Sequence, residues 1–178
     1  MMLKTLTAFA LFLLAVLPAA AEITSAQKEQ LAERITAFDV AIRANDVAEI
    51  LKVTPPKIYE FLSEQAGMPV AELQKLVIEQ MGEVMKDVEI QELSMDTGQT
   101  EYLTTPDGTD YALVPSYFVM STPEIGTIET KSHTLALRDN DQWYLLRIDN
   151  PQQLLIMKQV YPSFTNVEFP RGSVKTVE

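Results

Sequence analysis

The first half of the chain repeats its apolar residues every three or four positions, the period of a helix with one buried face. After Thr24 this spacing continues to about Ala44, and the charged residues fall between the apolar ones. Thr24 and Gln27 have the spacing of a capping box, in which each side chain bonds the backbone of the other residue. We therefore expect an amphipathic helix from Thr24 to about Ala44, whose apolar stripe is Leu31, Ile35, Phe38 and Ile42.

Three breaks divide the rest of this half into further helices. Asn45 and Asp46 end the first helix, and Asp46 is a suitable cap for a short second one. The segment 54–56 predicts a third helix with Thr54 as N-cap and proline in the first turn, and Gly67 is its expected left-handed end. A fourth helix is expected after Pro69, with an apolar stripe of Val70, Leu73, Leu76 or Val77, Met81 and Val84.

From Val88 the apolar period changes to two, and β-branched and aromatic residues become common, which is typical of strands. Tight turns at 106–108 and 139–141 carry the Pro, Asp, Asn and Gly residues that such turns need, and strands joined in this way are antiparallel. The segment 154–161 predicts a helix, and an edge strand is expected through Val167 to Phe169. The expected long strands are 88–95, 100–105, 109–121, 128–138 and 142–149.

The strand at 109–121 is apolar on both faces, so we expect it to be central or covered on both sides. Helices followed by an antiparallel meander predict an α+β fold. Its N-terminal helices pack on a curved antiparallel sheet of about five strands, and a C-terminal helix follows. No linker-like composition interrupts 22–178, which predicts a single domain.

Residues 1–21 have the pattern of a secretory signal peptide. Lys4 gives a basic start, an apolar run extends from Leu6 to Leu17, and three alanines at 19–21 match the A-x-A cleavage pattern. A spanning helix needs roughly 20 apolar residues, more than this run holds before Pro18. We therefore expect cleavage after Ala21 and a periplasmic or secreted protein of a Gram-negative envelope, with no membrane span after cleavage.

Charge and composition narrow the expected partners. The formal net charge of −11 argues against nucleic acid and anionic membranes, because both are bound through clustered Lys and Arg. The chain has no cysteine, which excludes disulfides, thiol catalysis and cysteine-based metal sites. It has neither a glycine-rich phosphate loop nor a G-x-S-x-G motif, and we expect no cofactor.

Two segments carry a resemblance to a known family. Residues 37–51 read as an opening helix, an Asn-Asp break and a short second helix, and 141–148 reads as a late strand bearing a tryptophan. With the order of elements, they resemble the nuclear transport factor two-like superfamily, whose fold is a cone and which includes relatives of ketosteroid isomerase and scytalone dehydratase. The resemblance implies a cavity beside the first helix, and catalytic members often place an acid of that helix in it.

The weak catalytic candidates are Asp39, Tyr117 and His133. His133 is the only histidine, and histidine titrates near neutral pH. Asp39 would be the acid of the first helix, although its spacing from Arg43 also fits a surface ion pair. Tyr117, together with Tyr111, would offer hydroxyl groups for an oxyanion site. One histidine among scattered carboxylates does not form a recurring ligand pattern, so we expect no metal site.

The sequence favours binding over catalysis. Our leading hypothesis is a non-catalytic exported module that holds a small apolar ligand or an envelope partner protein. One open alternative is an isomerase- or dehydratase-like enzyme in which Asp39, Tyr117 and His133 converge. Another is an envelope structural protein that forms a homodimer through its sheet. Five aromatic residues are the expected lining of a binding site, with core packing as the alternative for each: Phe38, Tyr111, Tyr117, Phe118 and Trp143.

Overall fold

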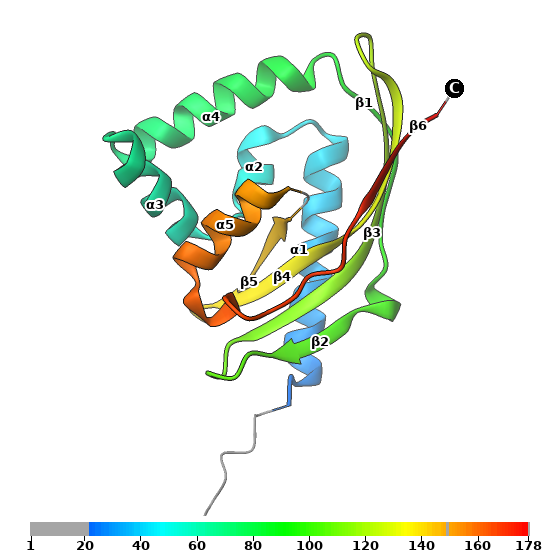
Figure 1. Cartoon of the computed structure of the whole chain (residues 1–178). Coiled ribbons are helices and arrows are strands. Elements are labelled where there is room, and N and C mark those ends of the chain that lie inside the picture. The colour runs from blue at the N-terminus through cyan, green and yellow to red at the C-terminus, as the bar shows by residue number, and fades with distance from the viewer. Residues whose placement is uncertain (1–21, 149, 178) are drawn as a thin grey trace, which may run out of the picture.

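The computed structural model describes residues 22–148 and 150–177, and the expected signal peptide lies outside these residues. The described chain has an α+β fold with a curled antiparallel sheet, which confirms the predicted fold class (Figure 1). The helices are α1 (Ser25–Arg43), α2 (Val47–Leu51), α3 (Pro56–Ala66), α4 (Val70–Met85) and α5 (Pro151–Val160). The strands are β1 (Glu89–Met95), β2 (Glu101–Thr104), β3 (Asp110–Thr122), β4 (Gly126–Asp139), β5 (Gln142–Arg147) and β6 (Ser173–Val177).

The first two helices begin where their capping residues predicted. The Gln27 amide donates to the Thr24 hydroxyl, and the Thr24 amide donates to the Gln27 side chain at 2.6 Å, which completes the capping box. Asn45, with a φ of 53°, separates α1 from α2. The Asp46 side chain then caps α2 by accepting from the Glu49 amide at 3.1 Å. These local hydrogen bonds set the two helix starts.

The end of α3 was predicted correctly and its beginning was not. Gly67 ends the helix with a φ of 66°, a conformation that glycine adopts at little cost. The N-cap, however, is Pro55 and not Thr54, and no side chain caps this helix. Because Pro56 at the first helical position has no N–H, one of the donors that a cap would satisfy is missing.

The sheet is built on a long hairpin of β3 and β4, in register from Tyr111–Leu137 to Thr122–Gly126. On its outer side β3 pairs first with β2 and then with β1, and β4 pairs with β5 and β6. Pro115 lies where the partner of β3 changes, and its carbonyl accepts from the Asp96 amide at 2.9 Å. The missing N–H of Pro115 faces this same side, which explains why a central strand tolerates proline.

The base of the hairpin is buried on both faces, as the two apolar faces of 109–121 predicted. One face packs on α1, and the other packs on α5 and the segment after it. The α1 face includes Ala112, Val114, Ala136, Trp143 and Leu145. The opposite face includes Tyr111, Leu113, Leu135 and Leu137, packed with Met157, Tyr161 and Phe164. Further along β3, Phe118 and Met120 continue the α1 face towards α4.

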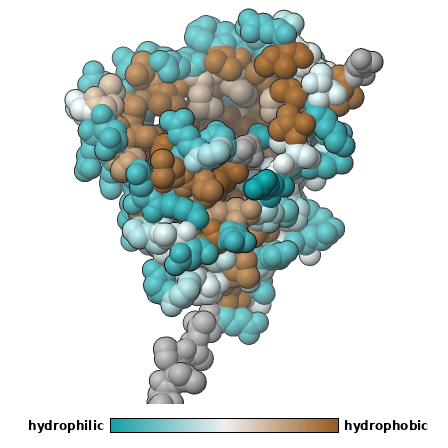
Figure 2. Space-filling model, in the orientation of Figure 1, coloured by the Kyte–Doolittle hydropathy of each residue, from teal (hydrophilic) through white to brown (hydrophobic). Residues whose placement is uncertain are grey.

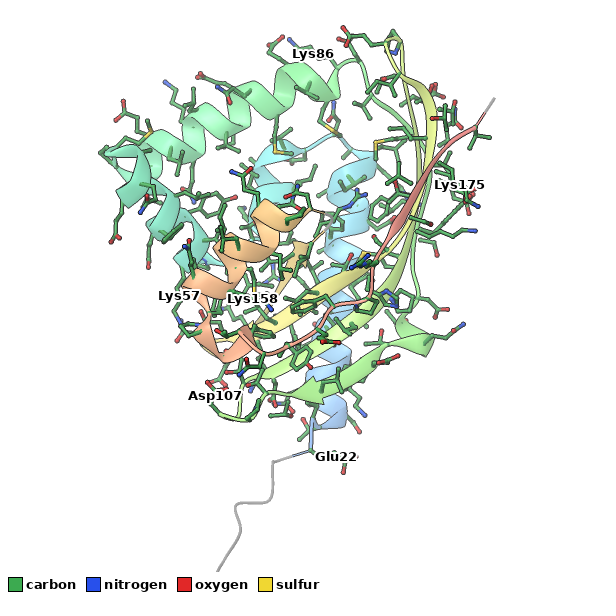
Figure 3. The ribbon with its side chains drawn as sticks, viewed as in Figure 1. Glu22, Lys57, Lys86, Asp107, Lys158 and Lys175 are labelled. Carbon is green, nitrogen blue, oxygen red and sulfur yellow. The ribbon has the colours of Figure 1, made fainter. Side chains whose placement is uncertain are left out.

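The predicted edge strand at 167–169 is wrong, and the sixth strand forms later, as β6. Lys158, labelled in Figure 3, donates from Nζ to the carbonyl oxygens of Thr165 at 2.8 Å and Val167 at 3.1 Å. The ring of Phe169 stacks on that of Phe164, with centroids 6.3 Å apart. These contacts hold the segment against α5, so it reaches the edge of β4 only at Ser173.

A buried tyrosine joins three elements on the α5 side. The Tyr161 hydroxyl donates to Asp139 Oδ2 at 3.1 Å, and Lys57 Nζ lies 2.9 Å from Asp139 Oδ1 (Lys57 is labelled in Figure 3). Asp139 therefore connects the start of α3, the β4–β5 turn and the end of α5. Burial, and next the negative charge of Asp139, raise the pKa of Tyr161 well above the ordinary value of 10.0.

Tyr161→Phe is expected to lower the free energy of unfolding at neutral pH by about 1 kcal/mol, the usual net value of one hydrogen bond. Because the pKa of Tyr161 is raised in the folded state, the unfolded chain loses this proton first as the pH passes about 10. The parent protein should then lose stability faster than the variant, so the difference shrinks. Urea unfolding of both proteins at neutral pH and near pH 11 measures this difference in the free energy of unfolding. A difference that is the same at both pH values would contradict the raised pKa.

Candidate functional site

A cavity of about 600 Å³ lies beneath α4 and is the candidate functional site. Its walls come from all five helices, from β1, β3, β4 and β5, and from the short connections after α2 and α4. Figure 2 shows this face of the molecule hollowed below α4, with hydrophobic residues gathered around the hollow. Its lining includes Phe38, Met81, Met85, Phe118, Met120 and Arg147.

Helix α4 covers the cavity on the side away from the sheet (Figure 1). It contacts α2 and α3, and none of its residues is buried (Figure 1). Met81, Val84 and Met85 line the cavity, and Val84 remains 66% exposed. The polar face points outward, where Lys86, labelled in Figure 3, lies 2.6 Å from Glu83. The apolar stripe of α4 was predicted from its period, but it faces a cavity and not a packed core.

The lining is apolar and rich in methionine. Because methionine is unbranched and has three rotatable bonds, it adapts to ligands of different shape. The few polar residues are Thr54, Thr134, Arg147 and Gln153, and Arg147 is the one charged side chain among the described residues of the lining. The Thr134 hydroxyl lies 2.8 Å from the Ser116 hydroxyl. The methionines of the lining are Met81, Met85, Met120 and Met157.

The structure brings two of the five expected binding residues to the cavity, Phe38 and Phe118. Trp143 is only 2% exposed in the core beneath α1, and its indole N–H donates to the Gln27 carbonyl at 2.8 Å. Tyr111 is buried on the opposite face of the sheet, with its ring edge-on to Phe164 at a centroid distance of 5.2 Å. Tyr117 lines a separate cleft.

The three catalytic candidates do not converge. Asp39 lies on α1 beside a groove that includes Leu93 and Met95, and both of its carboxylate oxygens accept from Arg43 Nε, at 2.9 and 3.1 Å. This hydrogen bond and the carboxylate charge raise the pKa of the Arg43 guanidinium. Tyr117 and His133 line a different cleft. The acid–base set that the enzyme alternative needs is therefore not assembled.

The cleft that Tyr117 and His133 line has a volume of about 590 Å³ and lies between β3, β4 and the chain near Arg171. Beside it, the negative charge of Glu129 is paired with the positive charge of Lys131. The Tyr117 hydroxyl donates to Glu129 at 3.2 Å, and Lys131 Nζ lies 3.3 Å from the same carboxylate. Desolvation and the contact with Glu129 raise the pKa of Tyr117, while Lys131 lowers the pKa of Glu129. The phenol is thereby kept protonated, which does not suit it to act as a base near neutral pH.

In the part of the chain that the structure describes, no three His, Asp or Glu side chains come together in a way that could hold a metal ion. None of the helices in this part of the chain combines the length and the hydropathy needed to cross a membrane.

Comparisons of the chain with protein-family models, with curated proteins and with solved structures found no match. Function therefore has to be inferred from the geometry of the chain itself.

Sequence reasoning missed most of the cavity wall. The stripe of α4 was recognised as apolar, but Met81, Val84 and Met85 were not assigned to a site. Arg147 was also missed, although a usable signal existed. Arg147 follows Trp143 and Leu145 at intervals of two along β5, so it lies on the same face of the strand as these two buried residues.

Proposed function

We propose that the protein is a non-catalytic binding module that holds a small apolar molecule in the cavity beneath α4. The observation that carries this proposal is the cavity itself, about 600 Å³ in volume, with a lining that is almost entirely apolar. Ligand sites in proteins typically have volumes of roughly 300–1,000 Å³ and combine apolar walls with a few polar groups. Two predictions from the sequence extend this proposal. The signal peptide predicts a periplasmic location, and the resemblance to the cone fold predicts the superfamily.

The chemistry of the wall favours a flexible aliphatic ligand. Apolar side chains that face a solvent-accessible space leave surface in contact with water, and a bound hydrocarbon chain would remove that contact. Each buried methylene group contributes about 0.8 kcal/mol. The methionines on α4, β3 and α5 can adjust to a chain whose exact course varies.

A series of neutral n-alcohols of increasing length tests the proposal. Affinity for the purified protein is expected to rise about fourfold per methylene group, the equivalent of 0.8 kcal/mol, until the chain fills the cavity, and then to level off. Isothermal titration calorimetry measures this directly, and apolar burial should give a negative heat-capacity change. Absence of binding across the series, or an affinity that does not change with length, would contradict the proposal.

The geometry bears on one of the two alternatives, the enzyme, and leaves the other, the homodimer, as it was. An enzyme would need Asp39 near Tyr117 and His133, and the structure places Asp39 in a separate groove. A homodimer formed through the sheet stays a prediction, and the mass of the protein in solution would test it.

A further inference from the structure

Arg147 occupies an unusual position in the cavity wall. It is the last residue of β5 and pairs with Thr134 across the β4–β5 ladder. Its guanidinium carbon lies 4.7 Å from the centroid of the Phe118 ring, which also lines the cavity. Arg147 thus places a permanent positive charge against an aromatic wall, at the sheet side of the cavity.

This arrangement favours an anion as part of the ligand. The Phe118 ring contacts one face of the guanidinium through a cation–π interaction, which holds the positive charge at the cavity wall. A guanidinium has five N–H donors in a fixed fork, so it can bind a carboxylate or phosphate in addition to the contacts that it already makes. The methionine-lined space beneath α4 begins beside this charge and suits an aliphatic chain.

We propose that the ligand is an anionic single-chain amphiphile, with its carboxylate or phosphate head bound to Arg147 and its chain beneath α4. This inference rests on the proposed function and adds the chemistry of the head group. The overall charge of the protein works against it, because a net charge of −11 repels anions at long range. A preference for an anionic ligand must therefore come from a local cation, and Arg147 is the one in the described lining.

The test compares dodecanoate, dodecyl phosphate and dodecanol, which share one chain and differ in the head group. The parent protein is expected to bind at least one of the two anions about tenfold or more tightly than dodecanol, as expected for a hydrogen bond to a charged group. Arg147→Met should remove this advantage, so that the variant binds the two anions no more tightly than it binds dodecanol. Arg147→Lys should keep part of it, because lysine retains the charge but loses the fork.

Arg171→Met is the matched control, since it removes the same charge from an exposed residue in the separate cleft of Tyr117 and His133. It should leave the ratio of anion to alcohol affinity unchanged. The anion that binds more tightly identifies the head group as a carboxylate or a phosphate, and either supports the proposal.

The two proposals fail in different ways. If dodecanol binds and neither anion binds more tightly, the head-group inference is overturned and the proposed function stands. If none of the three ligands binds, the proposed function itself is contradicted. The ratio in the parent protein decides between these outcomes even if Arg147→Met does not fold.

Discussion

Trp143→Ala is expected to lower the free energy of unfolding by about 3–5 kcal/mol, a large share of the total stability of a domain of this size. Trp143 is 2% exposed and packs in the core shared by α1 and β3–β5. Its indole N–H also donates to the Gln27 carbonyl at 2.8 Å, which ties β5 to the first turn of α1. Truncation of a buried tryptophan costs about 3–5 kcal/mol, and a domain of this size has only about 5–15 kcal/mol in total. No disulfide is available to offset the loss.

Far-UV circular dichroism with urea unfolding measures the effect, because the variant lacks the only tryptophan and cannot be followed by its fluorescence. Trp143→Phe separates the two contributions: it keeps much of the packing, leaves the Gln27 carbonyl without this donor and should cost less than the alanine variant. Val40→Ala, at a position 61% exposed, is the control and should change stability by less than about 0.5 kcal/mol. An alanine variant within 1 kcal/mol of the parent would contradict the assigned role of Trp143.

The parts of the fold that were predicted correctly are those determined by neighbouring residues. The capping box of Thr24 and Gln27 and the left-handed end at Gly67 depend on contacts within a few positions. The turn at 139–141 is equally local, with φ values of 49° for Asn140 and 61° for Asp141. Such features can be recognised in a sequence because the chain brings their partners together without help from the rest of the fold.

The errors in the predicted strands arise where contacts between residues far apart in the sequence determine the structure. The segment at 167–169 has the composition of a strand, but Lys158 binds the carbonyl oxygen of Val167 and Phe164 stacks on Phe169. Neither contact can be read from the alternation of residues. Pro115 is a related case, because its place in a central strand depends on where β2 ends and β1 begins.

The candidate site was only partly predictable for the same reason. Periodicity places Trp143 and Arg147 on one face of β5, but they are four residues and about 13 Å apart along the strand. Trp143 lies beside the start of α1, whereas Arg147 reaches the cavity. Which aromatic residue is core and which is lining depends on the position of α4, and the apolar stripe of a helix does not reveal what it faces.

The cavity also represents a balance between stability and function. The base of the hairpin is buried on both faces, while the α4 side leaves apolar side chains partly exposed around the cavity. Filling such a space with side chains would ordinarily stabilise a protein, and retained cavities are therefore expected at sites where binding needs them.

Met81→Trp combined with Met120→Trp is expected to weaken the binding of apolar ligands while preserving the fold. The two residues line the cavity from α4 and β3, and larger side chains there would occupy the space that a ligand needs. Stability should rise by about 0.5–2 kcal/mol if the new rings fit. Dodecanol titration by calorimetry should show a lower affinity than that of the parent, and urea unfolding reports the stability.

Leu76→Trp is the matched control on the same helix, at a position 40% exposed that is not part of the cavity lining. It should bind dodecanol as the parent does. If the double variant is folded and still binds dodecanol with parental affinity, the ligand does not occupy the cavity beneath α4, and the site must be sought elsewhere. If the control loses binding as well, the position of α4 and not the volume of the cavity controls access.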